Sequence, residues 1–122
     1  MDPETRKEII RQLADAFGEL TDATPEGQPL HVVFNELVLP GGWTPSPVRA
    51  LAIYTGWPEQ RPEFYVDLSV VNRQGEPLRS PIDAFKIGEP WRGFSFTFPW
   101  PQDPPTAVRA IQLWITRFVE TT

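Results

Sequence analysis

Two segments of the chain repeat apolar residues at intervals of three and four, which is the period of an amphipathic helix. The first covers residues 3–20 and the second covers residues 104–119. Each begins at an Asp-Pro pair, in which Asp caps a helix well and Pro suits the first helical turn. The pattern therefore predicts helices over residues 3–20 and 104–119.

Between these segments, apolar and polar residues alternate over residues 48–55, 63–71 and 92–98, which predicts strands with one buried face. Residues 30–39 alternate as well, but the apolar phase changes, and a bulge near Asn35 and Glu36 reconciles the two halves. Residues 76–90 have no clear period and are expected to be mostly irregular. The order predicts one two-layer α+β domain over residues 1–122, an antiparallel meander sheet with both helices on one face.

The stretch Gly-Trp-Pro-Glu-Gln-Arg-Pro at residues 56–62 interrupts the strands. Pro58 and Pro62 remove two backbone donors, so neither a helix nor a central strand runs through this stretch. Trp57 precedes a proline and is expected to be extended, with its indole folded back over the preceding strand. We predict a rigid, packed corner.

Charge and composition narrow the classes of partner. The 122 residues carry 16 acidic and 11 basic side chains, a net charge of -5, and the basic residues are scattered, so we expect no nucleic-acid partner. No apolar run approaches the roughly 18 residues of a spanning helix, so we expect a cytoplasmic protein with no membrane contact. The absence of cysteine excludes a disulfide and a thiol nucleophile.

The sequence Trp57-Pro58 with Pro62 resembles the Tyr-Pro-x-x-x-Pro signature of the ubiquitin-conjugating (E2) and RWD fold. Trp91, Phe94 and Ser95 resemble an aromatic segment of bacterial E2-like families, with Thr97 where a His is expected. The resemblance covers roughly residues 32–118 and implies a helix, an antiparallel meander, the Pro-rich corner and a return to helices. The predicted meander is one strand short of this pattern unless residues 30–39 bend to supply two strands.

Catalysis by the usual E2 route is excluded, because thioester transfer needs a cysteine. His31 is the only histidine and is interpreted as a strand residue with a satisfied ring; the alternative is an enzyme that uses His31 with Asp67 or Glu36. No metal-ligand cluster or glycine-rich phosphate loop is visible, so no cofactor is expected.

Protein contact is the predicted role. Trp43 and Trp100 stand in Pro-rich loops where an exposed indole would anchor a partner or, as an alternative, a sugar or small ligand. By resemblance, E2 partners grip the first helix and the corner, which here carry Arg6, Lys7, Glu59, Gln60 and Arg61; ordinary solvation explains these charges equally well. The sequence is thus identified as a non-catalytic E2/RWD-like interaction domain of a bacterial ubiquitin-like conjugation or defence system, whose partner is an E1-like, ubiquitin-like or other operon-encoded protein.

Overall fold

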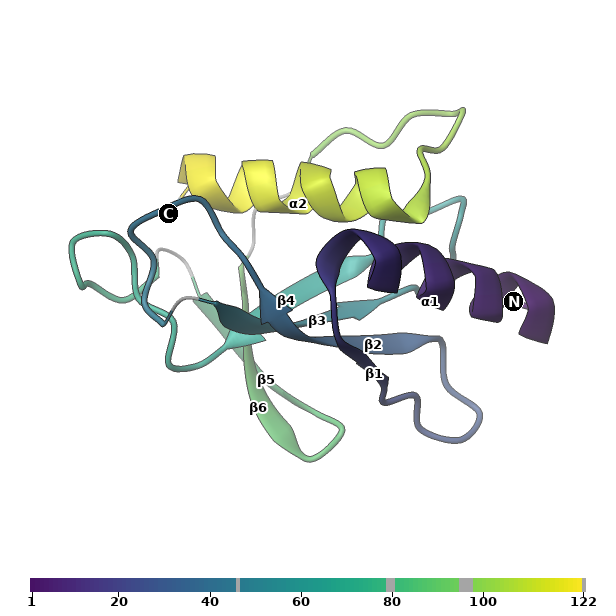
Figure 1. Cartoon of the computed structure of the whole chain (residues 1–122), viewed down its shortest axis with the longest axis horizontal. Coiled ribbons are helices and arrows are strands. Elements are labelled where there is room, and N and C mark those ends of the chain that lie inside the picture. The colour runs from purple at the N-terminus through teal and green to yellow at the C-terminus, as the bar shows by residue number, and fades with distance from the viewer. Residues whose placement is uncertain (46, 79–80, 95–97, 122) are drawn as a thin grey trace.

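The computed structural model describes residues 1–45, 47–78, 81–94 and 98–121. The chain runs through α1 (Pro3–Phe17), β1 (Leu20–Asp22), β2 (His31–Leu37), β3 (Val48–Ile53), β4 (Glu63–Asp67), β5 (Pro81–Lys86), β6 (Glu89–Phe94) and α2 (Ala107–Thr121). Figure 1 shows both helices on the same side of the sheet, in contact with each other. The predicted α+β class and the placement of both helices on one face are confirmed.

The first helix starts as the sequence predicts and ends earlier. The Asp2 carboxylate accepts the Thr5 N–H at 2.8 Å, and Pro3 occupies the first turn. The helix ends at Phe17 rather than at residue 20, because Gly18 adopts a φ of 84° and donates its N–H to the Ala14 carbonyl. Leu20 then belongs to β1, an edge strand that was not predicted.

The strands lie in the order β1-β2-β3-β4-β6-β5 and all neighbours are antiparallel. The pairing of β2 with β3 shifts register between Phe34 and Leu37, which confirms the bulge expected near Asn35 and Glu36. Residues 30–39 contain a single strand, β2, so the two-strand alternative for this segment is wrong. The predicted strand over residues 63–71 is shorter in the structure, because Asp67 turns the chain by accepting the N–H of Ser69.

Residues 76–90 contain β5 and the start of β6, so the expectation of an irregular segment is wrong. A two-residue turn at Ile87 and Gly88, with φ of 51° and 80°, joins the strands into a tight hairpin. Pro81 and Pro90 interrupt the apolar alternation in the sequence. Both nevertheless fit the hairpin, because at their positions in the ladder the backbone N–H would not bond the other strand of the hairpin. The strand predicted over residues 92–98 is β6, which is described only to Phe94; Ser95 and Thr97 of the aromatic motif lie outside the described residues.

The second helix begins at Ala107, three residues later than predicted. The Thr106 hydroxyl, rather than Asp103, caps it by accepting the Arg109 N–H at 3.1 Å. The side chains of its apolar face, Ile111, Trp114 and Phe118, are buried, as the period predicts. They pack with Ile9 and Leu13 of α1 in the main core between the helices and the sheet.

The opposite sheet face carries a small second core, formed by Val33, Leu51, Ile53 and Trp91. The β5–β6 hairpin turns away from the helices (Figure 1), and Ile87 in its turn packs against this cluster. The Arg49 guanidinium lies over the Trp91 ring and bonds Glu89 of β6 at 2.8 Å. The hairpin turn is thereby attached to the centre of the sheet.

Two indoles hold the Pro-rich corner. Trp114 of α2 donates its Nε1–H to the Pro62 carbonyl, and Trp100 donates to the Pro58 carbonyl at 2.9 Å. Trp57 packs edge-on against Tyr54 with ring centroids 5.2 Å apart, which confirms that its indole folds back over the preceding strand. The corner is therefore a packed structure in which side chains donate to the Pro58 and Pro62 carbonyls.

We predict that Trp114→Phe lowers the free energy of unfolding by about 1–3 kcal/mol, because it keeps a ring in the core and leaves the buried Pro62 carbonyl without a donor. Trp100→Phe is the matched control, and it is expected to cost about 1 kcal/mol or less because water reaches this half-buried position. Denaturant titration of both variants measures the difference. Equal losses would show that the Trp114 hydrogen bond has no special role.

Candidate functional site

A groove of about 440 Å³ opens beside the Pro-rich corner. We call it the corner groove. Its lining comes from residues 59–62 of the corner, from Glu63, Phe64 and Tyr65 at the start of β4, from Ile82 and Gly93 of the hairpin, and from Trp100 and Trp114. Segments that are distant in the sequence therefore meet at this one end of the sheet.

Aromatic rings form the apolar part of the corner groove. The Trp114 ring is stacked near Phe64 at 6.1 Å between centroids, and Phe98 meets Trp114 edge-on at 4.9 Å. Trp100 is half-buried between Phe98 and Trp57. The Nε1–H groups of Trp100 and Trp114 already bond corner carbonyls, so their ring surfaces, not their polar atoms, are what they offer to a ligand.

The charged part of the groove comes from the corner itself. Arg61 is half-buried, and its guanidinium lies 5.9 Å from the centre of the Phe98 ring. Among the described residues, no carboxylate lies within ion-pair distance of Arg61. Glu59 and Gln60 are exposed at the rim. The groove thus presents a guanidinium that is held by an aromatic ring and has no anionic partner within the described chain.

Glu63 is fixed by two hydroxyl groups. The Tyr65 hydroxyl donates to it at 2.6 Å and the Thr55 hydroxyl donates at 3.0 Å. Burial, with the Glu63 carboxylate as an additional cause, raises the pKa of Tyr65 well above its ordinary value of 10.0. Tyr65 therefore stays protonated at neutral pH and keeps this side of the groove in one arrangement.

Gly93 is required by the position of the Tyr65 ring. A Cβ atom at residue 93 would lie 2.9 Å from the ring atoms Cδ1 and Cε1. The ring therefore covers the glycine of the neighbouring strand, as aromatic side chains often do in sheets. Gly93 and Tyr65 together form the groove surface between the corner and Ile82.

The structure brings together the predicted contact residues Glu59, Gln60, Arg61 and Trp100, all of which line the corner groove. Sequence reasoning missed Tyr65, Ile82 and Gly93, because their part in the groove depends on the pairing of β4, β6 and β5. The only local signal was a glycine within an alternating aromatic segment, which marks a close approach in a sheet.

Arg6 and Lys7 lie elsewhere, on the N-terminal half of α1. They line a separate depression of about 370 Å³ with Met1, Ile10 and Asp22. Lys7 is exposed and 4.0 Å from Glu4. The structure does not bring them to the corner groove.

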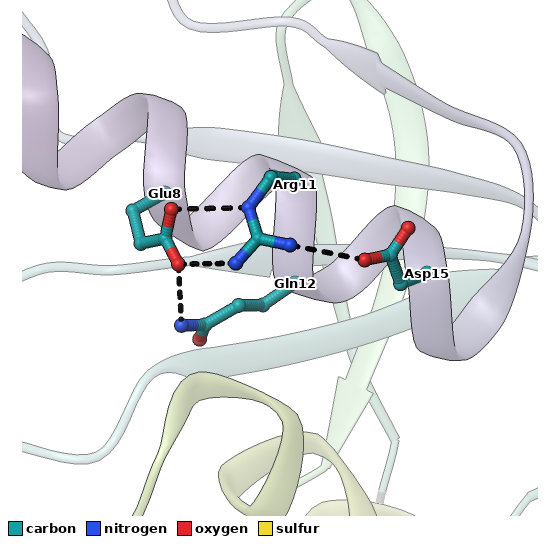
Figure 2. Close-up of polar contacts among 4 residues, drawn as sticks. All are labelled: Glu8, Arg11, Gln12 and Asp15. Carbon is teal, nitrogen blue, oxygen red and sulfur yellow. Dashed lines mark hydrogen bonds and ion pairs between the residues drawn. The ribbon is translucent and has the colours of Figure 1, made fainter.

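The next turns of the polar face of α1 carry charged side chains that pair with one another within the helix. Figure 2 shows Arg11 between Glu8 and Asp15, with Gln12 also bonded to Glu8. Hydrogen bonds from Arg11 and then Gln12 lower the pKa of Glu8. Because Arg11 is paired with both carboxylates, its guanidinium is already engaged within the helix, and the stretch keeps one net negative charge.

The expectation of an exposed indole at Trp43 is wrong. Its side chain is only 4% exposed and packs on Phe118 of α2, with ring centroids 4.7 Å apart. The Arg73 guanidinium covers the ring at 5.9 Å. The loop is rich in Pro and Gly, but α2 provides a place for the ring in the main core, so Trp43 and Trp100 form no common platform for a sugar.

His31 is a buried strand residue. It is 6% exposed, and its Nδ1 bonds the Pro29 carbonyl at 2.7 Å, which confirms the interpretation of a satisfied ring. Asp67 lies four residues beyond Glu63, the β4 residue in line with His31, and is therefore displaced by about 13 Å along the strand. Glu36 is five residues along β2 and exposed. The proposed His31-carboxylate pairs are not assembled.

Residues 1–45, 47–78, 81–94 and 98–121 contain no group of three or more metal-ligating side chains. In the same part of the chain, neither helix has the length and apolar character needed to cross a membrane. Comparison with models of known protein families, with curated proteins and with solved structures finds no match.

We predict that Gly93→Ala displaces the Tyr65 ring and lowers the free energy of unfolding by about 1–3 kcal/mol, the usual range for overpacking. The displaced phenol loses its bond to Glu63, so its pKa falls toward 10.0. Alkaline absorbance titration detects this change, because the chain has only two tyrosines. A titration identical to that of the unmodified protein would show that residue 93 has room for a methyl group.

Stability should also fall at high pH. Burial raises the pKa of Tyr54, and burial with the Glu63 bond raises the pKa of Tyr65, above the ordinary value of 10.0. Below pH 10.0 both phenols are protonated in the folded and unfolded chains and contribute no pH dependence. Above it the unfolded chain ionises first, so the free energy of unfolding decreases as the pH rises. Denaturation midpoints on the two sides of pH 10.0 measure this effect.

Proposed function

We propose that this protein is a non-catalytic interaction domain of the E2/RWD type that binds a protein partner through the corner groove. The observation that carries the proposal is the convergence of Glu59, Gln60, Arg61 and Trp100 on one groove. In the E2 enzymes that the sequence resembles, the Pro-rich corner is where partners bind. The proposed partner is an E1-like, ubiquitin-like or other operon-encoded protein of a bacterial conjugation or defence system, in the cytoplasm.

The chemistry of the groove supports a protein ligand. Tryptophan, tyrosine and arginine are the residues most enriched at the energetic centres of protein interfaces, and Trp100, Tyr65 and Arg61 line this groove together. Arg61 is held against Phe98, so little side-chain freedom is lost when it binds a carboxylate. The exposed rim residues Glu59 and Gln60 surround an aromatic centre, as in many interfaces.

Small-ligand binding is a second candidate, favoured by the size of the groove. Its volume of about 440 Å³ falls in the range of about 300–1,000 Å³ that is typical of small-molecule sites. Native mass spectrometry of the protein isolated from its host separates the two functions: a bound small molecule that is lost in Trp100→Ala supports this second candidate.

The partner is tested by affinity capture from the host, with mass-spectrometric identification. We expect an E1-like or ubiquitin-like protein to be captured by the unmodified domain, and Arg61→Glu combined with Trp100→Ala to weaken that binding by at least about a hundredfold, as loss of two central contacts implies. Arg109→Glu is the matched control, since Arg109 is exposed on α2 and does not line the groove.

A second pair of substitutions separates the two surfaces that the resemblance implies. Arg6→Glu with Lys7→Glu reverses the charges on α1 and leaves the groove intact. If the groove variants bind normally while the α1 variant does not, the partner surface is α1 and the groove assignment is wrong. Circular dichroism of each variant confirms that it remains folded.

A further inference from the structure

Within the part of the chain that the structure describes, β5 is an edge strand whose outward backbone groups have no partner. The turn at Ile87 and Gly88 makes Lys86 and Glu89 a bonded pair, and bonded pairs alternate along the ladder. Ala84 and Ile82 therefore bond β6, whereas the N–H and C=O groups of Asp83 and Phe85 point outward. Among the described residues, no loop or turn bonds these outward groups.

Burial in a core does not explain why β5 carries large apolar side chains. No side chain from Ile82 to Lys86 belongs to either core cluster. Phe85 is 78% exposed and Ile82 is 50% exposed. Natural edge strands are normally short, charged or covered, and an exposed edge with large apolar side chains is a place where another strand pairs.

The free edge is continuous with the corner groove. Ile82 lines the groove and pairs across the ladder with Gly93, on which the Tyr65 ring lies. A residue added opposite Ile82 has its side chain on the same sheet face as Ile82. Such a side chain lies at the groove, on the side that Tyr65 and Arg61 also line.

We propose that the partner contributes an extended segment, which adds a strand to β5, places an apolar side chain at the corner groove and pairs a carboxylate with Arg61. This inference rests on the proposed function and specifies how the partner binds. Backbone bonds to Asp83 and Phe85 supply affinity, and the groove supplies specificity, as in other proteins that bind peptides by strand addition. The segment is acidic because the guanidinium of Arg61 has no carboxylate within ion-pair distance among the described residues.

A second copy of this chain fits the edge less well. When two β5 strands pair about a twofold axis and form a continuous sheet, residues that lie opposite each other have their side chains on the same face of the sheet. Asp83 and Lys86 are three residues apart and lie on opposite faces of β5, so such a pairing never places one opposite the other. Pairing of two β5 strands also leaves Arg61 without a carboxylate, whereas an acidic segment of a partner supplies one.

The probe for the test is a displayed library of random dodecapeptides, selected on the unmodified protein. We expect enrichment of peptides with alternating apolar residues and at least one Asp or Glu. On binding of a synthesised winner, hydrogen exchange measured by NMR should slow about tenfold or more at the amides of Asp83 and Phe85, because these donors gain acceptors. Enriched peptides that leave both amides unprotected, or a selection that enriches none, overturn the proposal.

A backbone variant gives an independent result. Phe85→Pro removes an outward N–H that β6 does not use, and Phe85→Ala removes the same ring and keeps the N–H. We expect Phe85→Pro to bind the peptide about tenfold more weakly than Phe85→Ala, the value of one hydrogen bond of about 1.4 kcal/mol. Equal affinities contradict strand addition. Ala84 and Trp91 face each other in the ladder, so their amide chemical shifts report whether the hairpin is intact in each variant. If Phe85→Pro disrupts the hairpin, the hydrogen-exchange result on the unmodified protein tests strand addition by itself.

The two proposals fail in different ways. If the captured host partner is lost in the Arg61 and Trp100 variant but binds Phe85→Pro and Phe85→Ala equally, the groove function stands and strand addition is wrong. If neither set of variants affects the partner, both proposals are wrong. A purely dimeric protein in analytical ultracentrifugation, made monomeric by Phe85→Pro, would assign the edge to a second copy and overturn the proposal.

Discussion

The hydrogen bond from the Trp114 indole to the Pro62 carbonyl joins the last helix to the loop on which the candidate site depends. Prolines at residues 58 and 62 stop the sheet from continuing and leave corner carbonyls without strand partners. A buried carbonyl must find a donor, and an indole is long enough to supply one from across the core. Because Glu63 starts β4 directly after this bond, the same contact fixes the direction in which β4 enters the sheet. The bond holds Pro62 next to Trp114, and both residues line the groove.

Local physical chemistry explains what the sequence predicted correctly. The Asp2 cap, the two helical periods and the phase change near Asn35 each depend on neighbouring residues, and each is present in the structure. The errors come from interactions between distant residues. Leu20 continues the helical apolar pattern yet pairs with Phe34 of β2, and Trp43 sits in a Pro/Gly-rich loop yet is buried by Phe118. The apolar pattern alone does not show whether such a residue pairs in a sheet or is buried in the core.

The same division applies to the candidate site. Glu59, Gln60 and Arg61 were predictable because they lie between the two prolines, where a loop must be exposed on one side. Tyr65, Ile82 and Gly93 were not, because β4 first had to pair with β6 and not with the strand that follows it along the chain. A hairpin whose second strand inserts beside β4 leaves its first strand outermost. Such a crossing of sequence order has no signature in apolar periodicity, and the prolines of this segment further concealed it.

The topology also explains why neither helix covers β5. Both helices pack on the main core, whose members come from β2, β3 and β4 but include no described side chain of β5 or β6. The hairpin turn packs on the opposite sheet face instead. There Ile87 covers the second core, and Glu89 holds Arg49 over Trp91. These contacts direct one end of the hairpin away from the helix layer and leave the other end, with Ile82 and Gly93, beside the corner. Among the described residues, β5 is paired on one side only, by β6, and its outward hydrogen-bonding groups have the orientation that an added strand requires. The strand order that places Gly93 beneath Tyr65 is therefore also the strand order that places a free edge next to the groove.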